Sequence, residues 1–171
     1  MQVLAVAATK LVAQAGSGFD VDVTIGQGLV GGAVGAFLTT LVVGAIAVAV
    51  FPERTERLMA RVLDDPAGSF AHGLLCVVGL FVAALVLVFT IIGIVVAFPL
   101  LLVAYVVWAV GAAVAYLAIA DRLVGHEDGW LKPLLVAATI NGALAATGVG
   151  SILAVAIGIT GFGAVLQPYL D

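Results

Sequence analysis

The chain has 171 residues, of which 64% are hydrophobic and 9% are charged, and its net charge is −4. Its mean hydropathy is +1.33. A soluble domain carries about 25% charged residues, so this composition excludes an ordinary globular protein. The negative charge argues against a nucleic-acid partner. The length leaves room for one membrane domain and no separate soluble one.

Residues 1–26 form an N-terminal segment of two parts. Residues 1–15 are apolar but too short to span a bilayer. They end in Ala13-Gln14-Ala15, an A-x-A pattern that predicts a signal peptide cleaved after Ala15. Lys10 interrupts the apolar run, so a short interfacial helix retained on the mature protein is the alternative. Residues 16–26 form a small, acidic link with Asp20 and Asp22.

The first span is predicted at about 27–51, and a different segment follows from Pro52. In 52–69 the apolar residues share one face, while Arg54, Arg57 and Arg61 recur at helical spacing. This pattern predicts a short amphipathic helix on the membrane surface, closed by Pro66 and Gly68. We expect its solvated face, together with the later loop 121–133 and its Trp130, to be a partner-binding surface.

Residues 70–120 contain no Asp, Glu, Lys or Arg. One helix of that length would be about 75 Å long, against about 30 Å of hydrocarbon. The chain must therefore turn, and the predicted helix breaks are Thr90, Gly93 and Pro99. They give spans of 69–89 and 99–120. The uncharged connection 90–98 is expected to stay near membrane depth, and a tight interfacial hairpin is the alternative.

A second polar loop, 121–133, places Trp130 as an interfacial anchor. The last apolar region, 134–166, is one long tilted span or a helix broken near 148–150. Five of the six Lys and Arg residues lie in the two loops, which predicts that both loops are cytoplasmic. The N-terminus and Asp171 are then outside. The sequence thus predicts an all-α membrane protein with four transmembrane helices and one amphipathic interfacial helix between spans one and two.

Small residues recur every four positions in the first and last spans. Such stripes let helix backbones approach closely in lipid. We predict a packing seam between spans one and four, with contacts between protomers as the alternative, and the second stripe favours a continuous last helix. The stripes contain Gly28, Gly32, Ala36, Thr40 and Gly44, and then Ala138, Gly142, Ala146, Gly150, Ala154 and Gly158.

We find no catalytic, cofactor or metal constellation. Residues 26–31 match G-x-G-x-x-G, but the following segment is a membrane span with no partner strand. His126, Glu127 and Asp128 are adjacent in a loop, which is poor spacing for one metal site. No polar residue inside the spans is ionisable, and Asn141 is expected to bond across helices.

Several short segments resemble the multi-span membrane domain associated with bactofilin-type polymer-forming cytoskeletal proteins, in a haloarchaeal version. The resemblance covers roughly 27–166 and departs at 93–95, where the family often has Gly-Ile-Pro. The segments are 52–57, 90–94 with Pro99, 105–123, 147–150 and 161–164. The resemblance implies an anchor or scaffold in the cell membrane and supplies no catalytic residue.

The function predicted from these features is therefore non-enzymatic. We expect a membrane anchor or scaffold, in contact with the lipid bilayer, that holds a protein partner of an envelope or cytoskeletal assembly on the cytoplasmic side. A small channel or transporter is the alternative. Its path would pass the two Thr-x-x-Gly segments, Thr90–Gly93 and Thr147–Gly150, and Asn141.

Overall fold

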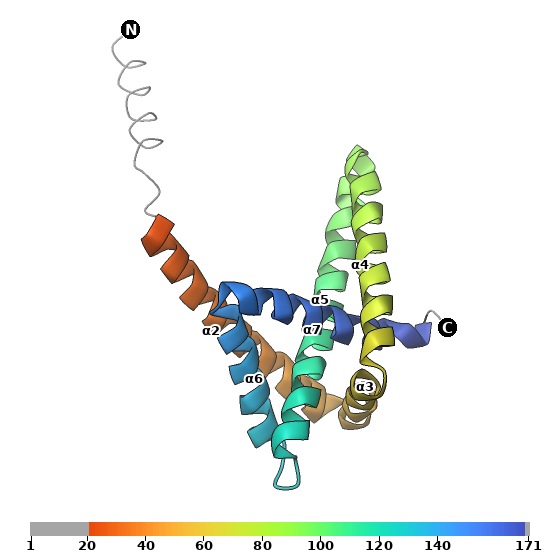
Figure 1. Ribbon diagram of the computed structural model, residues 1–171. Coiled ribbons are helices and arrows are strands. Elements are labelled where there is room, and N and C mark those ends of the chain that lie inside the picture. Colours follow the sequence, from red (N-terminus) through yellow and green to blue (C-terminus); the bar gives the residue numbers. More distant parts are fainter. Residues whose placement is uncertain (1–20, 170–171) are drawn as a thin grey trace.

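The computed structural model describes residues 21–169, which form six α-helices and one short 3-10 helix, with no strand among them (Figure 1). The predicted all-α class is confirmed. The predicted signal peptide and Asp171 lie outside the described residues. The elements are α2 (Val21–Val50), α3 (Pro52–Asp64), α4 (Pro66–Val88), α5 (Ile91–Val124), α6 (Leu131–Ala145), α7 (Gly148–Leu166) and η1 (Gln167–Tyr169).

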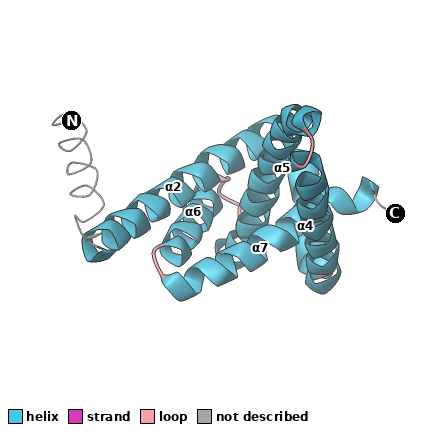
Figure 2. Cartoon of the chain, turned by 90° about the horizontal axis from the view of Figure 1, so that it is seen from above, coloured by secondary structure: helices cyan, strands magenta, loops and turns pink. Residues whose placement is uncertain are grey.

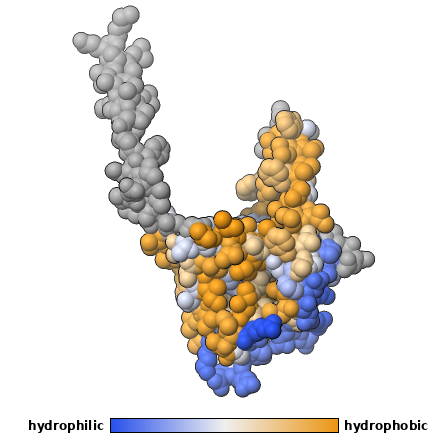
Figure 3. Space-filling view, in the orientation of Figure 1, coloured by the Kyte–Doolittle hydropathy of each residue, from blue (hydrophilic) through white to orange (hydrophobic). Residues whose placement is uncertain are grey.

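Four helices are long and apolar enough to cross a membrane, as predicted. These segments are Val30–Val50, Pro66–Val88, Val95–Val124 and Val149–Leu166. Large apolar side chains stand exposed along them, including Phe81 at 65% and Phe98 at 73%. Figure 3 shows hydrophobic residues over most of the visible surface. Because water would not tolerate so much exposed apolar surface, the chain is a multi-pass membrane protein.

Helix α2 begins at Val21, within the segment predicted as a link. No proline interrupts 21–26, and glycine is common in transmembrane helices, so the helix extends beyond the predicted start of the span. Helix α4 likewise begins at Pro66 and not at Ser69. The reason is Asp65, whose carboxylate accepts a hydrogen bond from the Gly68 N–H at 2.9 Å.

The chain turns between α4 and α5 at Thr90. This residue is extended, with φ −120° and ψ 140°, and its hydroxyl accepts a hydrogen bond from the Gly93 N–H at 2.9 Å. The predicted break at Pro99 is wrong, because Pro99 lies inside α5. The predicted non-helical connection 90–98 and the predicted break at Gly93 are also wrong, because α5 begins at Ile91. The Thr90 cap starts the helix, and a proline is tolerated within a transmembrane helix.

The continuous last helix that the small-residue stripe favours is also wrong, and the alternative, a helix broken near 148–150, is confirmed. Helix α6 ends at Ala145, and α7 starts after Thr147. Thr147 has φ −115° and ψ 136°, and its hydroxyl accepts a hydrogen bond from the Gly150 N–H at 3.1 Å. The two Thr-x-x-Gly segments therefore form the same turn, and each connects two consecutive helices.

Helix α7 crosses the other helices and packs against both α4 and α5, while α6 lies along α2 (Figures 1 and 2). The buried core surrounds the C-terminal half of α5, where Tyr116, Leu117 and Ala118 are at most 1% exposed. Met59 and Val62 of α3 join this core from the side. The amphipathic helix is thus fixed to the bundle by its apolar face.

Candidate functional site: the charged face

Hydrophilic residues gather at the lower end of the molecule in Figure 3, where α3 and the α5–α6 connection lie. We call this surface, formed by residues 52–65 and 121–132, the charged face. Arg54, Arg57 and Arg61 of α3 are all exposed on it. Their spacing of three and four residues places them on one side of the helix.

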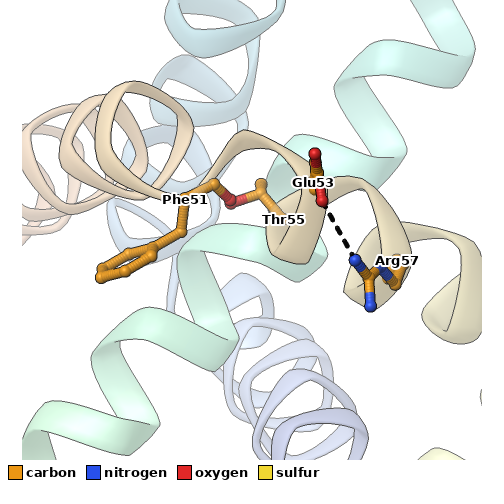
Figure 4. Close-up of polar contacts among 4 residues, drawn as sticks. All are labelled: Phe51, Glu53, Thr55 and Arg57. Atoms are coloured by element: carbon orange, nitrogen blue, oxygen red, sulfur yellow. Dashed lines mark hydrogen bonds and ion pairs between the residues drawn. The ribbon is translucent and has the colours of Figure 1, made fainter.

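One ion pair joins α3 residues within this surface (Figure 4). The Arg57 guanidinium donates to the Glu53 carboxylate at 3.2 Å, and the two side chains are 71% and 84% exposed. An exposed pair of this kind stabilises a helix by about 0.3–0.5 kcal/mol. Its charges therefore remain available to a partner.

Thr55 fixes the angle between α2 and α3. It is 2% exposed, and its hydroxyl lies 3.0 Å from both the Ala47 and the Phe51 carbonyl oxygens. These carbonyls also accept from the Phe51 and Thr55 N–H groups at 2.9 and 3.0 Å, so the hydroxyl adds a further contact that ties the first turn of α3 to the end of α2. Thr55, Met59 and Val62 face the bundle, which turns the arginines outward.

The α5–α6 connection is ordered by local contacts. The His126 and Trp130 rings stack with centroids 4.4 Å apart and an interplanar angle of 8°. His126 Nδ1 lies 2.6 Å from an Asp121 carboxylate oxygen, and Lys132 forms an ion pair with Asp128. Trp130, predicted as an interfacial anchor, is partly buried and packs against the core.

The C-terminal end of α7 also lies at this face. Gln167 and Pro168 line a groove together with Arg61, Asp64 and Asp65. The predicted position of this end, at the interface opposite the basic loops, is therefore wrong. The reason is the turn at Thr147, which sends the chain back toward the side from which α6 started.

The α2–α6 contact is built from small residues and one polar bridge. The Asn141 amide nitrogen donates to the Thr40 hydroxyl at 2.7 Å and lies 3.4 Å from the Ala36 carbonyl oxygen. A Cβ at Gly142 would lie 3.2 Å from the Ala33 carbonyl oxygen, and a Cβ at Gly44 2.9 Å from Leu134. Ala138 is fully buried in α6.

The remaining residues of the two stripes lie elsewhere. Gly28 and Gly32 face open space, with no heavy atom within 4 Å of a Cβ built on them. Ala146 and Gly150 belong to the turn. Ala146 is the residue after α6, and the Gly150 N–H donates a hydrogen bond to the Thr147 hydroxyl. Ala154 packs against the core from α7, and a Cβ on Gly158 would lie 2.8 Å from the Trp108 ring.

The closest backbone contacts involve glycines that the stripes did not include. A Cβ on Gly163 would lie 1.8 Å from the Ser69 carbonyl oxygen, and a Cβ on Gly161 2.0 Å from that of Gly111. These positions are where α7 crosses α4 and α5. The sequence held a signal for the first crossing, because Ser69 and Gly73 form a small-xxx-small pair.

The titratable residues form pairs and not clusters. His72 Nδ1 lies 2.8 Å from the Gly68 carbonyl oxygen of its own helix. Across residues 21–169, no group of three or more His, Cys, Asp or Glu is placed to hold a metal ion.

Comparison with known proteins places the chain in a family. No curated protein and no solved structure matches it. A family model described as "Domain of unknown function (DUF8173)" matches residues 1–171. Because that match covers the whole chain, this membrane protein belongs to the DUF8173 family.

Proposed function

We propose that this protein is a non-enzymatic anchor or scaffold of the cell membrane that holds a protein partner against the charged face. The observation that carries the proposal is the arginine row of α3. Its helix is fixed to the bundle by buried Thr55, Met59 and Val62, so its outer side is a rigid, exposed surface. Arginine side chains suit recognition of carboxylates on a partner.

The distribution of charge supports a cytoplasmic position for this surface. Arg122 and Lys132 lie in or beside the α5–α6 connection, so five of the six basic residues of the chain belong to the charged face. Loops rich in Lys and Arg favour the cytoplasmic side. The resemblance to membrane domains associated with polymer-forming cytoskeletal proteins fits a partner in an envelope or cytoskeletal assembly.

The test is charge reversal of the arginine row. We expect Arg54→Glu, Arg57→Glu and Arg61→Glu together to abolish recovery of the partner in a pull-down from mild detergent. The control is a triple variant with glutamine at the same positions, which removes charge without adding repulsion and should retain part of the binding. Both variants must reach the membrane fraction at the wild-type level. Recruitment unchanged by the reversal would refute the proposal.

The alternative function, a channel or transporter, makes a different demand. Its path would need free polar groups, but the Thr90 and Thr147 hydroxyls cap helices and Asn141 bonds to Thr40. We therefore rank it second. Flux of ions, water or small solutes through liposomes that contain the purified protein would reverse this order.

A further inference from the structure

A cavity of about 400 Å³ lies between α2, α3 and α5, beside the charged face. Eight of its ten lining residues are apolar, and Ile46 and Val106 on its wall are 55% and 54% exposed. Both side chains belong to predicted membrane-spanning segments. The cavity therefore opens sideways toward hydrocarbon, and its volume lies within the usual range of small-ligand sites, about 300–1,000 Å³.

The polar end of this cavity is Arg54. The other polar residue of its lining, Thr55, uses its hydroxyl on the carbonyl oxygens of Ala47 and Phe51. The Arg54 guanidinium carbon lies 5.8 Å from the centre of the Phe51 ring. An apolar cavity with one cation at its rim is complementary to a molecule that has an apolar chain and an anionic head.

A second groove, of about 260 Å³, continues from this point. It is lined by Arg54, Arg57 and Arg61, with Leu58, Val165 and Pro168. Arg54 and Leu58 therefore belong to both the apolar cavity and the basic groove. The two meet at the α2–α3 corner, where the chain passes from an apolar span to a charged surface helix. This corner is at the depth expected for lipid headgroups.

We propose that one anionic phospholipid binds here, with an acyl chain in the apolar cavity and its phosphate against Arg54. Arg57 and Arg61 add positive charge along the groove that receives the rest of the headgroup. The acyl chain exchanges contacts with other lipids for contacts in the cavity, so its burial does not select one lipid over another. Selectivity must therefore come from the headgroup, because the arginines of the groove favour a net anion over a phosphate that carries its own choline cation.

The test measures lipid binding to the purified full chain in dodecyl maltoside by native mass spectrometry. The probes are dioleoyl phosphatidylglycerol and dioleoyl phosphatidylcholine, which share their acyl chains and differ in net charge. We expect at least tenfold tighter binding of phosphatidylglycerol. Arg54→Gln should weaken that binding about tenfold and weaken phosphatidylcholine less, because the choline cation offsets its phosphate, whereas Lys132→Gln, an equal loss of charge, should change neither.

A second pair of variants tests the apolar part. Val106→Trp should fill the cavity and weaken both lipids about tenfold. Val103→Trp lies one turn away on α5, is 61% exposed in the wild type and does not line the cavity, so it should have no effect. Equal binding of the two lipids, or wild-type binding by either Arg54→Gln or Val106→Trp, would overturn the proposal.

A soluble anion is the competing explanation. Glycerol 1-phosphate carries the phosphate without the chains, and displacement of phosphatidylglycerol by it at equal concentration would overturn a lipid site. No protein partner is present in these measurements. Their outcome is therefore separate from that of the pull-down, although both involve Arg54.

Discussion

Gly163 is the position where a single methyl group should do most damage. It lies where α7 crosses α4, and a Cβ there would be 1.8 Å from the Ser69 carbonyl oxygen, 2.5 Å from the Gly73 nitrogen and 2.9 Å from the Gly73 Cα. All three atoms are backbone, so no side chain can rotate away. The helices must separate until the shortest contact grows from 1.8 Å to at least 3.0 Å.

The magnitude of the effect follows from two opposing contributions. Overpacking in a well-packed core costs about 1–3 kcal/mol when neighbours can adjust. Contact between two backbones leaves less room for adjustment, so we expect Gly163→Ala to cost at least the upper value. Alanine favours a helix over glycine by about 1 kcal/mol. The expected net loss in free energy of unfolding is therefore about 2 kcal/mol or more.

The assay is reversible unfolding in mixed micelles, followed by circular dichroism as the fraction of dodecyl sulfate rises. The matched control is Gly79→Ala in α4, where a Cβ meets no heavy atom within 4 Å. That variant should be as stable as the wild type or slightly more stable. If Gly163→Ala unfolds at the same dodecyl sulfate fraction as Gly79→Ala, the close crossing of α7 and α4 is refuted.

Three further predictions concern the seam, the turn and the topology. Asn141→Leu and Thr40→Val should each lower the free energy of unfolding, and a double-mutant cycle should give a coupling of about 0.6–1.7 kcal/mol; additive effects would exclude the hydrogen bond. Thr147→Ala should cost about 1 kcal/mol in the same assay while Thr147→Ser keeps the cap, and equal losses would contradict the capping role. A C-terminal cysteine should be labelled by a membrane-impermeant maleimide from the same side as one at Glu127, in a Cys76→Ala background, and labelling from opposite sides would contradict the folded arrangement.

Elements with a local cause could be predicted from the sequence. Pro52, the arginine row and the apolar face determine α3 within 13 residues, and the structure places that helix at Pro52–Asp64. The turn at Thr90 is equally local, because a threonine hydroxyl and the N–H three residues later suffice to start a helix. Pro99 misled the prediction because a proline does not have to end a transmembrane helix, and Pro99 lies exposed within α5.

The length of residues 134–166 indicated a break between α6 and α7, whereas the small-residue stripe favoured one continuous helix. Residues 134–166 would form a helix of about 50 Å, well beyond the hydrocarbon thickness. The stripe from Ala138 to Gly158 nevertheless keeps its four-residue spacing through the turn. A four-residue spacing does not show whether its residues share one packing face or belong to two different helices. Here Gly142 packs against α2, whereas Gly158 packs against Trp108 of α5.

The two Thr-x-x-Gly turns divide the part of the chain after α2 and α3 into two helix pairs, α4–α5 and α6–α7. In each turn the threonine hydroxyl also donates to the carbonyl three residues earlier, Leu87 or Leu144, at 3.1 Å. In each pair the second helix returns the chain to the side on which the first helix began. The α6–α7 pair starts at the charged face, and α7 ends beside Arg61. This return follows from the positions of the two ends and does not depend on the lengths of the two helices. Since only α2 crosses without returning, the two ends of the bundle should lie on opposite sides of the membrane, and the C-terminal end should share a side with the arginine row.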